Sequence, residues 1–280
     1  MLLFKTINDI KHWLYSIDKP FGFVPTMGAL HQGHMSLIKE SQQRDKVTVV
    51  SIFVNPTQFN NATDFEKYPI TTTADIELLC KQKVDALFLP TVNEIYPSPN
   101  TATDIDIGYL DSVLEGEKRP GHFKGVYQVV HRLLEIIQPD NLYMGLKDYQ
   151  QVMVIKLLLE QQQLGTNLIA IPTIREKSGL AMSSRNVRLS QEAIEIAPSI
   201  YETLQYILRN QSKQQFAILQ QRAIERLTSQ GFEVEYLTLA TKNTMQILDN
   251  FSTTEDMVLL IAAWLDGVRL IDNIFIPHAL

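Results

Sequence analysis

Short apolar runs alternate with segments of helical periodicity over about the first 170 residues. Strands are predicted at 22–24, 47–54, 85–89, 141–144 and 167–171. The run VTVVSIFV, 47–54, is apolar on both faces, as expected for a strand buried inside a parallel sheet. Helices are predicted between the strands, with a period near 3.6 from Phe123 to Ile137 and another helix over 148–163. This alternation predicts a doubly wound parallel α/β sheet with right-handed crossovers.

The pattern changes after about residue 175. Two helical segments are predicted near 190–209 and 214–229, and alternating strands follow at 232–240, 257–264 and 268–276. Helices followed by short strands of this kind predict a smaller α+β domain with an antiparallel sheet. We therefore expect two domains, a Rossmann-like domain over 1–174 and a smaller C-terminal α+β lid domain over 175–280.

Composition narrows the class of protein. The chain has 280 residues, of which 45% are hydrophobic and 20% charged, as in a soluble globular protein. A net charge of −6 argues against a nucleic-acid partner, and we find no apolar run long enough to span a membrane. The apolar neighbours of Cys80, the only cysteine, predict that it is buried. We expect a cytoplasmic protein without nucleic-acid or membrane partners.

The stretch PTMGALHQGH, 25–34, follows a predicted strand and leads into a helix, where open α/β sheets bind ligands. Gly28 and Gly33 allow a tight turn and close approach of a ligand to the backbone. Main-chain N–H groups at a helix start favour phosphate. His31 and His34, two of only six histidines, could stabilise phosphate charge there. The alternative is a turn with two surface histidines, and a metal site would lack a third ligand nearby.

The stretch FVNPTQF, 53–59, ends the predicted buried strand. Its uncharged amides, Asn55 and Gln58, suit the hydroxyl and carboxylate groups of a small ligand. An ordinary Asn-Pro turn is the alternative, and this segment alone favours the turn.

The stretch YMGLKDYQQ, 143–151, contains a strand end and a helix start. Gly145 follows the strand and Asp148 opens the helix, so Lys147 stands where a cation can reach a phosphate. Gln151 falls one turn later on the same side as Asp148. The alternative is an ordinary helix start with an exposed lysine.

The stretch GLAMSSRN, 179–186, joins the two predicted domains. One glycine, two serines and Arg185 supply backbone donors, hydroxyls and a planar cation, a combination that binds polyphosphate. A flexible linker would account for Gly179 and the serines, but it gives no reason for the arginine.

The order of these motifs resembles a known family. An H-x-G-H motif followed by a Met-Ser-Ser-Arg loop is similar to the HIGH and KMSKS pair of the nucleotidylyl-transferase and class I synthetase superfamily. Six strings together resemble the pantothenate synthetase (pantoate–β-alanine ligase) family: PTMGALHQGH, FVNPTQF, RPGHFKGV, GLKDYQQ, REKSGLAMSSRN and VRLIDN. The first motif alone indicates only the superfamily, whereas the six strings, which run from Pro25 to Asn273 in family order, are specific.

The resemblance implies a two-step reaction that uses ATP and Mg²⁺. Pantoate's carboxylate attacks the α-phosphate of ATP to give pantoyl adenylate and pyrophosphate. The amine of β-alanine then displaces AMP to give pantothenate, which serves coenzyme A biosynthesis. The family is dimeric through its N-terminal domain, which implies a homodimer.

The resemblance also implies the site residues. His31, His34, Lys147 and Arg185 would be catalytic, with His34 as the proton donor. ATP would be bound by Met27, Gly28, Ala29, Leu30, His31, Gln32, Gly33, His34, Gly145, Leu146, Lys147, Asp148, Ile174, Met182, Ser183, Ser184 and Arg185. Pantoate would be held by Gln58, Gln151 and Asn55. In RPGHFKGV, His122 either borders the pantoate pocket or belongs to a structural loop.

Three positions depart from the family pattern. Leu146 stands where the family usually has Glu, which removes a polar contact unless binding there is through the backbone. The pair Lys177-Ser178 stands where the family often has Pro-Asp, which alters the rigidity expected for the loop REKSGLAMSSRN. One acid, Asp75, follows the string Tyr68-Pro69-Ile70-Thr71 where the family often has two, so the protein ligands of Mg²⁺ stay unassigned.

Three other functions compete with the ligase. A small nucleotidylyltransferase would release a nucleotidyl product, but the pair Gln58 and Gln151 suits a small polar acid. A fragment of a class I aminoacyl-tRNA synthetase would need a tRNA-binding surface, and this chain is acidic without a basic stripe. A nucleotide-binding regulatory protein would bind ATP without turnover, and the intact histidines, Lys147 and Arg185 argue against it.

Overall fold

A computed structural model describes residues 1–97 and 105–278 of the chain. The chain divides into two compact units. The first unit comprises Met1–Leu146 and Gln150–Pro172, and the second comprises Lys147–Tyr149 and Thr173–Leu280. The expected domain boundary after residue 174 falls next to this division, and the lid role of the second unit stays a prediction.

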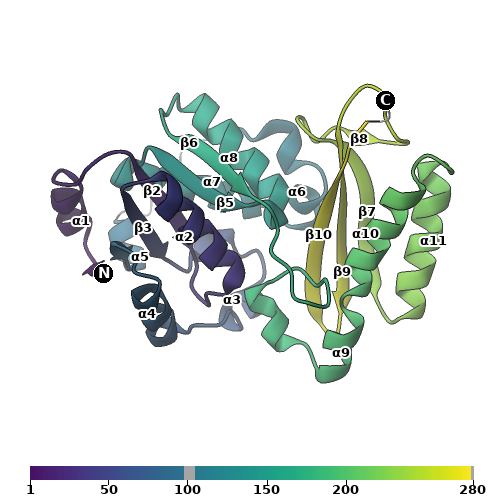
Figure 1. Ribbon diagram of the computed structural model, residues 1–280, viewed down its shortest axis with the longest axis horizontal. Coiled ribbons are helices and arrows are strands. Elements are labelled where there is room, and N and C mark those ends of the chain that lie inside the picture. The colour runs from purple at the N-terminus through teal and green to yellow at the C-terminus, as the bar shows by residue number, and fades with distance from the viewer. Residues whose placement is uncertain (98–104, 279–280) are drawn as a thin grey trace. The chain divides into compact units, whose positions relative to one another are not determined.

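The first unit is built on a six-stranded parallel sheet (Figure 1). Its strands are β1 (Leu2–Phe4), β2 (Phe21–Thr26), β3 (Val47–Ile52), β4 (Ala86–Phe88), β5 (Asn141–Gly145) and β6 (Asn167–Ile171). Their spatial order is β1-β4-β3-β2-β5-β6, and every pairing is parallel. The doubly wound parallel sheet predicted from the sequence is confirmed. The edge strand β1 was not predicted, because three residues are too few to show a periodicity.

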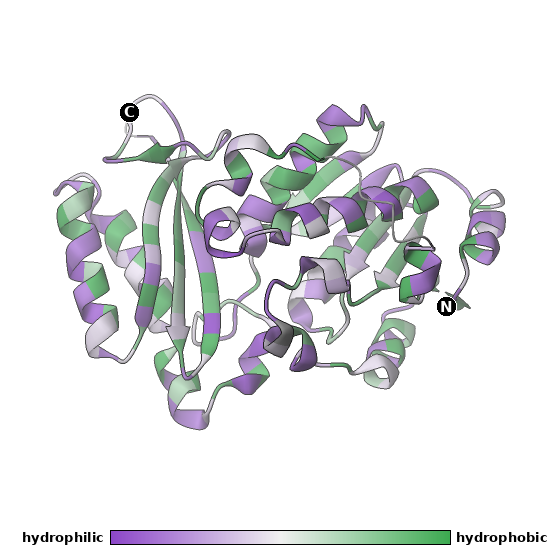
Figure 2. Cartoon of the chain, turned by 180° about the vertical axis from the view of Figure 1, so that it is seen from behind, coloured by the Kyte–Doolittle hydropathy of each residue, from purple (hydrophilic) through white to green (hydrophobic). Residues whose placement is uncertain are grey.

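Helices cover both faces of this sheet. The helices in this part of the chain are α1 (Ile7–Leu14), α2 (Gln32–Arg44), α3 (Ala62–Glu66), α4 (Thr72–Lys81), α5 (Val92–Ile95), α6 (Glu115–Lys118), α7 (His122–Ile137) and α8 (Tyr149–Gln161). Successive strand residues alternate between two cores: Phe23 packs with α1, α7 and α8, whereas Val24 packs with α2 and α4. Figure 2 shows the helices with both hydrophobic (green) and hydrophilic (purple) residues along their length.

The strand order places a topological switch point between β2 and β5. The chain runs outward from β2 through β3 to β4 on one side, and from β5 to β6 on the other. Open α/β sheets bind ligands beyond the carboxyl ends of the strands at such a point. The segments that leave β2 and β5 there are Met27–His31 and Gly145–Leu146.

The second unit is the smaller α+β fold that the sequence predicts. Its helices are α9 (Gln191–Ile196), α10 (Ser199–Asn210) and α11 (Phe216–Ser229), and its strands are β7 (Glu233–Thr241), β8 (Ile247–Leu248), β9 (Met257–Leu265) and β10 (Val268–Ile276). The strands form an antiparallel sheet in the order β10-β9-β7-β8. One face of this sheet packs against α10 and α11 through residues such as Leu204, Leu219 and Ile261.

Two expectations were wrong in detail. The segment 190–209 is two helices rather than one, because Pro198 lacks the N–H that would continue α9 into α10. That proline was visible in the sequence. Cys80 is exposed rather than buried, because the inward stripe of α4 is formed by Asp75 and Leu79, and Cys80 follows on the outer side.

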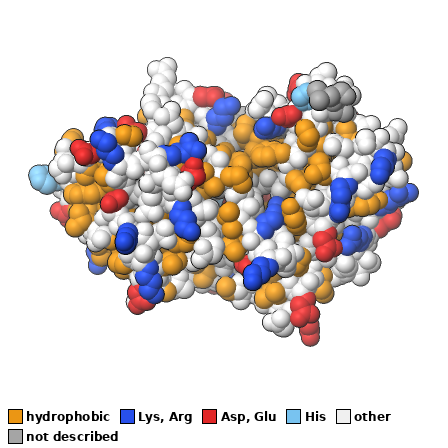
Figure 3. All heavy atoms as spheres, viewed as in Figure 1, with side chains coloured by type: hydrophobic (Ala, Val, Ile, Leu, Met, Phe, Trp, Pro, Cys, Tyr) orange, Lys and Arg blue, Asp and Glu red, His pale blue; other side chains and the backbone are white. Residues whose placement is uncertain are grey.

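Two further observations concern membrane-spanning helices and the distribution of charged side chains on the surface. Within the residues that the structure describes, we find no helix that is both long and apolar enough to cross a membrane. On the face drawn in Figure 3, blue lysine and arginine side chains are interspersed with red acidic ones.

Candidate active site

His31 and His34 together form the N-terminal cap of α2. Nδ1 of His31 accepts a hydrogen bond of 3.1 Å from the main-chain N–H of Gly33. Nδ1 of His34 accepts one of 3.2 Å from the main-chain N–H of His31. This reciprocal arrangement is a capping box in which two histidines replace the usual Ser or Thr and Glu. The spacing of two residues between the histidines is therefore the spacing that closes the cap.

The cap also fixes the protonation pattern of the two rings. Because both Nδ1 atoms accept hydrogen bonds, the neutral tautomer that fits carries its hydrogen on Nε2. The ring centroids lie 4.1 Å apart, so the two imidazoles are direct neighbours at the start of α2. Two such donors beside a helix N-terminus suit the oxygens of a phosphate.

A buried carboxylate shapes the turn before this cap. Asp75 is 3% exposed, and it accepts hydrogen bonds from the main-chain N–H groups of Ala29 at 2.9 Å and Leu30 at 2.8 Å. Ala29 has a φ of +49° and Gly28 a φ of +81°. A Cβ on Gly28 would lie 3.0 Å from Oδ2 of Asp75, so the close approach requires glycine as well. Asp75 thus holds the turn that delivers the two histidines.

The turn after β3 presents Gln58. It is the 3₁₀ turn η1 (Pro56–Gln58), and Asn55 holds it. Asn55 Nδ2 donates to Oε1 of Gln58 and to the carbonyl of Gly125, and its Oδ1 accepts from Thr57 and from the Tyr96 hydroxyl. Both amide hydrogens of Asn55 are therefore already used inside the first unit.

Gln58 keeps capacity for a ligand. Its Nε2 donates to the thioether sulfur of Met27 at 3.2 Å, and sulfur is a weak acceptor. Its Oε1 accepts from Asn55 and retains a second lone pair. The neighbours therefore orient the Gln58 side chain. Its weak hydrogen bond to the Met27 sulfur can be replaced by a stronger one to an oxygen of a ligand.

The start of α7 supports the same turn and accounts for the string RPGHFKGV. His122 bonds through Nδ1 to the carbonyl of Gln58 at 2.8 Å, and Arg119 lies 3.0 Å from its Nε2. A Cβ on Gly125 would lie 2.4 Å from the carbonyl oxygen of Thr57, so no other residue fits there. Of the two roles left open for His122, the contacts favour the structural one.

Two consecutive glutamines at the start of α8 have different roles. Gln150 is buried, donates to the carbonyls of Leu110 and Val113, and accepts from the main-chain N–H of Glu115. All three hydrogen bonds of its amide therefore hold the loop from Leu110 to Glu115. Gln151 is half-buried, and its side chain makes no hydrogen bond to any residue in the described part of the chain. The sequence alone could not separate these two neighbours.

In the second unit, the string REKSGLAM forms a hairpin turn. The main-chain N–H of Glu176 bonds to the carbonyl of Leu180, that of Gly179 to Glu176, and that of Met182 to Ile174. Lys177 and Ser178 occupy the two central positions of this turn, both exposed. The backbone bonds close with this pair in place, so the departure from the family's Pro-Asp leaves the turn hydrogen-bonded.

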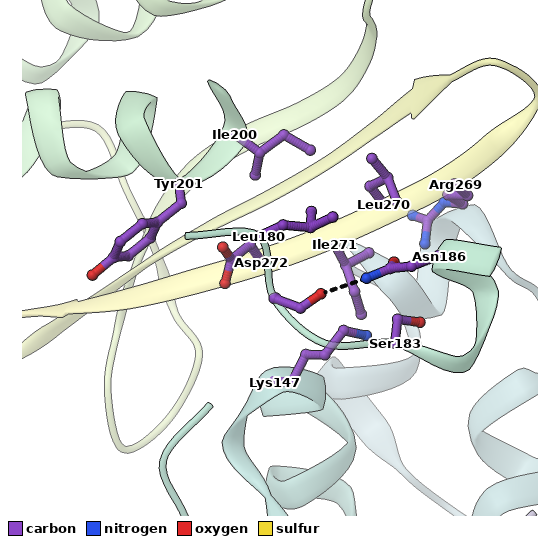
Figure 4. A pocket seen from close by; sticks show the side chains of 11 residues that line it. Lys147, Leu180, Ser183, Asn186, Ile200, Tyr201, Arg269, Leu270, Ile271 and Asp272 are labelled. Atoms are coloured by element: carbon purple, nitrogen blue, oxygen red, sulfur yellow. Dashed lines mark hydrogen bonds between the residues drawn. The ribbon is translucent and has the colours of Figure 1, made fainter. Parts of the chain in front are cut away.

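The loop after the hairpin leads into η4 (Ser184–Arg188). Ser183 Oγ accepts from the main-chain N–H of Arg185 at 3.2 Å and caps this short turn. Asn186 donates to the carbonyl of Ala181 at 3.0 Å, the dashed line of Figure 4. Asn186 Oδ1 is buried with no partner in the described residues.

A small pocket of the second unit lies beside this loop (Figure 4). Lys147, Ser183, Asn186, Arg269 and Asp272 are among the residues that line it, and Lys147 projects toward the loop that carries Ser183. Its volume of about 10 Å³ has room for roughly one water molecule. A nucleotide is far larger, so this pocket alone cannot hold one.

The predicted ligand residues divide between the units. Met27 to His34, Asn55, Gln58, Gly145, Leu146 and Gln151 belong to the first unit, and Lys147, Asp148, Ile174 and Met182 to Arg185 belong to the second. Asp148 ends η3 (Leu146–Asp148), directly before α8, rather than opening the helix. Sequence reasoning missed Asp75 as the support of the histidine turn; its position as a single acid at the inner stripe of α4 was the available signal.

Comparison with known proteins decides the family. The model of the family described as pantoate–β-alanine ligase matches residues 2–275. The chain belongs to the pantoate–β-alanine ligase family. A relative from Cytophaga hutchinsonii, named pantothenate synthetase, is 47% identical over 260 residues, which cover 91% of each chain. A relative of the same name from Porphyromonas gingivalis W83 is 41% identical and covers 98% of this chain and 99% of its own.

Solved structures of the ligase family agree with this assignment. The pantothenate synthetase from Thermus thermophilus matches with a TM-score of 0.90 at 34% identity, over 98% of this chain and 99% of that one. A pantoate–β-alanine ligase from Francisella tularensis, complexed with β-γ ATP and β-alanine, matches with a TM-score of 0.83 at 41% identity, over 98% of this chain and 97% of that one. Membership of the ligase family replaces the nucleotidylyltransferase, synthetase-fragment and regulatory-protein alternatives.

Proposed function

We propose that this protein joins pantoate to β-alanine, converting ATP to AMP and pyrophosphate, and so makes pantothenate. One observation carries the proposal: nearly the whole chain matches a family whose relatives are named pantothenate synthetase. The Francisella relative, complexed with β-γ ATP and β-alanine, supports ATP and β-alanine as substrates.

The first step activates pantoate. One carboxylate oxygen of pantoate forms a bond to the α-phosphorus of ATP, and the bond from that phosphorus to the bridging oxygen of the β-phosphate breaks. Pyrophosphate leaves with the electron pair, and pantoyl adenylate remains. Because the substrate supplies the nucleophile, the protein's work is positioning and stabilisation of charge.

Residues of the first unit are assigned to ATP and pantoate. Met27 to His34, with Gly145 and Leu146, contact ATP, and the Nε2–H groups of His31 and His34 donate to phosphate oxygens. His34 is assigned as the proton donor in the sense of a hydrogen-bond donor: its Nε2–H stays on the ring and donates to an oxygen of the departing pyrophosphate, which leaves as the anion. Gln58 and Gln151 bind pantoate directly. Asn55 serves the pantoate site by fixing Gln58, since its own hydrogens are used within the unit.

Residues of the second unit are assigned to the nucleotide. Lys147 and Arg185 are catalytic cations that neutralise charge growing on the phosphates. Asp148, Ile174, Met182, Ser183 and Ser184 contact ATP. Leu146, in the first unit, replaces the family's Glu without loss of function if its contact with ATP is through the main chain.

The second step forms the amide. The neutral amine of β-alanine attacks the acyl carbon of pantoyl adenylate, a C–N bond forms, and the C–O bond to the phosphate of AMP breaks. AMP leaves as the anion, and the amine nitrogen gives up its proton to solvent. No covalent intermediate on the protein is needed in either step.

Mg²⁺ would enter with ATP. Among the described residues we find no group of three or more His, Cys, Asp or Glu side chains that could hold a metal. Mg²⁺ usually keeps several waters and is bound through substrate phosphates and one or two carboxylates, so it does not need such a group. It would neutralise the triphosphate, and we assign it no protein ligand.

Two further assignments complete the proposal. The family resemblance supports a homodimer formed through the first unit, which light scattering during gel filtration tests directly. The use of ATP and of small soluble substrates supports a cytoplasmic location. The remaining partners are pantoate, β-alanine and ATP.

Isotope exchange between ATP and pyrophosphate tests the two-step route. With pantoate and Mg²⁺ present and β-alanine absent, we expect labelled pyrophosphate to appear in ATP. Omitting pantoate should abolish the exchange. A parallel assay of AMP formation, with each substrate omitted in turn, should need all three.

The outcomes separate the alternatives. No exchange and no AMP formation, despite ATP binding, would refute the ligase assignment. Exchange that strictly requires β-alanine would contradict a free pantoyl adenylate and indicate a concerted reaction or a cycle in which pyrophosphate leaves last.

A further inference from the structure

The string VRLIDN ends with two polar residues buried in a strand. Asp272 and Asn273 lie on β10 and are 4% and 6% exposed. Burying a polar side chain costs free energy unless it finds a hydrogen-bond partner. Neighbouring residues of a strand point to opposite faces of the sheet, so these two must find their partners on different faces.

Asp272 finds its partner on the face that α10 covers. Arg175 donates from Nη1 to Oδ2 of Asp272 at 2.5 Å and from Nη2 to Oδ1 at 2.8 Å. Its guanidinium lies 3.7 Å from the ring centre of Tyr201 on α10, and it also donates to the carbonyl of Gly179 at 3.2 Å. Burial raises the pKa of the Asp272 carboxyl, and the hydrogen bonds from Arg175 oppose that rise.

These contacts hold the start of the loop Met182 to Arg185, which is called the phosphate loop below. Arg175 pairs with Ala181 across the hairpin, and Gly179 ends its turn, directly before the loop Met182 to Arg185. A bidentate Arg–carboxylate pair sets both distance and orientation. The start of the loop is therefore attached to β10 through Asp272.

Asn273 finds its partner on the other face. Its Nδ2 donates to the main-chain carbonyl of Lys147 at 2.9 Å. Two residues further along the same face, the ring of Phe275 meets that of Tyr149 at a centroid distance of 5.4 Å. The Tyr149 hydroxyl in turn donates to the carbonyl of Lys242. The segment Lys147–Tyr149 is thus attached to the second sheet, and Asn273 makes the contact at the lysine itself.

We propose that Asp272 and Asn273 are positioning residues for adenylation, one setting the phosphate loop through Arg175 and the other setting Lys147. The inference rests on the proposed function, because it assumes that Lys147 and the loop act on ATP. It gives the string VRLIDN a role: two adjacent residues of one rigid strand hold two cationic elements at a fixed separation. Neither residue touches substrate in this proposal.

The Asn273 half is tested with two variants. Asn273→Ala leaves a cavity and Asn273→Leu fills it, but both remove the donor to the Lys147 carbonyl. We expect pantoate-dependent exchange to fall by about 10-fold in both, the scale of a slightly misplaced catalytic group. Asn250→Ala is the matched control, because Asn250 also binds main chain, accepting from Phe216 N–H at 3.0 Å and Phe251 N–H at 2.9 Å. It should keep the wild-type exchange rate.

A double-mutant cycle identifies the path of the effect. In a Lys147→Ala background, Asn273→Leu should cause no further loss, because there is no lysine left to misplace. An equal factor of loss with and without Lys147 would overturn the assignment. So would wild-type exchange in both Asn273 variants. If wild-type protein itself shows no exchange, the proposed function fails, and that result is distinct from either outcome.

The Asp272 half is tested at Arg175. Arg175→Lys keeps the positive charge but loses the bidentate pair and the stacking on Tyr201. We expect it and Asp272→Asn each to raise the KM for ATP at least about 5-fold with the KM for β-alanine unchanged, and the double variant to be no worse than either single one. A loss confined to kcat, with both KM values at wild type, would mean fewer folded molecules and would overturn the positioning role.

Discussion

The carboxylate of Asp75 accepts a hydrogen bond of 2.9 Å from the main-chain N–H of Ala29, a residue held at a φ of +49°. A positive φ is unfavourable for a residue with a Cβ, by about 1 kcal/mol or more. The hydrogen bonds to Ala29 and Leu30 offset that cost and keep the turn in the shape that leads into the two-histidine cap.

Asp75→Asn should therefore damage both stability and ATP binding. The new amide group would face one of the two N–H donors, and the lost hydrogen bond should cost about 1–3 kcal/mol in the free energy of unfolding. The KM for ATP should rise. Asp85→Asn is the control, because Asp85 also accepts from main chain, the N–H of Thr48 at 2.8 Å. It should lose stability in urea titrations with no change in the KM for ATP. An unchanged KM in Asp75→Asn would contradict the role of this contact.

The cap and the chemistry of His34 can be separated by two substitutions. Asn places an oxygen near the position of Nδ1 and should keep the bond from the His31 N–H, while removing the Nε2 donor. Gln places an N–H near the position of Nε2 and gives up the cap. We expect His34→Asn to fold with a melting temperature near wild type but to lose turnover by about 10²-fold or more, like His34→Ala.

His34→Gln should show the opposite pattern, with stability lowered and turnover better retained. It should be less stable, by roughly 1 kcal/mol for a lost cap, yet retain more turnover than His34→Asn. Stopped-time assays of AMP formation and thermal unfolding measure both quantities. Wild-type turnover in folded His34→Asn would mean that the histidine serves only the cap.

The glutamines are expected to act on pantoate. Gln58→Ala and Gln151→Ala should each weaken pantoate binding by about 1–3 kcal/mol, because a polar group of the bound acid would be left unpaired. ATP affinity should change much less. Gln150→Ala is the matched neighbour: its amide closes the loop at Leu110 to Glu115, so it should lower stability and leave pantoate affinity unchanged. Calorimetric titrations with each ligand decide this, and equal losses for pantoate and ATP would refute the division of roles.

Stability at high pH should depend on Tyr149. Burial raises the pKa of this phenol from 10 to about 12, so the protonated form, which donates to the Lys242 carbonyl, is favoured in the folded state. Its contribution is fully present below pH 10 and is lost as the pH rises through about 12. Urea unfolding of wild type and Tyr149→Phe between pH 8 and roughly 12 isolates the effect, since all other tyrosines are shared. We expect the two stabilities to converge above pH 10; a constant difference would contradict the raised pKa.

The sequence by itself determined the elements and the position of the chemistry. Apart from the edge strand β1, the strands of the first sheet follow from short apolar runs and the long strands of the second from local alternation, and β6 was predicted with its observed bounds. The H-x-G-H motif at a strand end and the serine–arginine loop could be recognised from the sequence, because glycine, histidine and arginine close together in a loop indicate phosphate binding. The six strings carried the family resemblance that the comparisons confirm.

The tertiary structure decided what each polar side chain does. Gln150 and Gln151 are adjacent and chemically identical, but a helix turns by about 100° per residue, so only one faces the loop that it closes. Cys80 depended on the rotation of α4 in the same way. The bonds that give Asp75, Arg175, Asp272 and Asn273 their roles join residues 45 to 126 positions apart. A local sequence pattern carries no information over such separations. Buried polar groups are satisfied by partners that folding brings together, and only the folded chain names those partners.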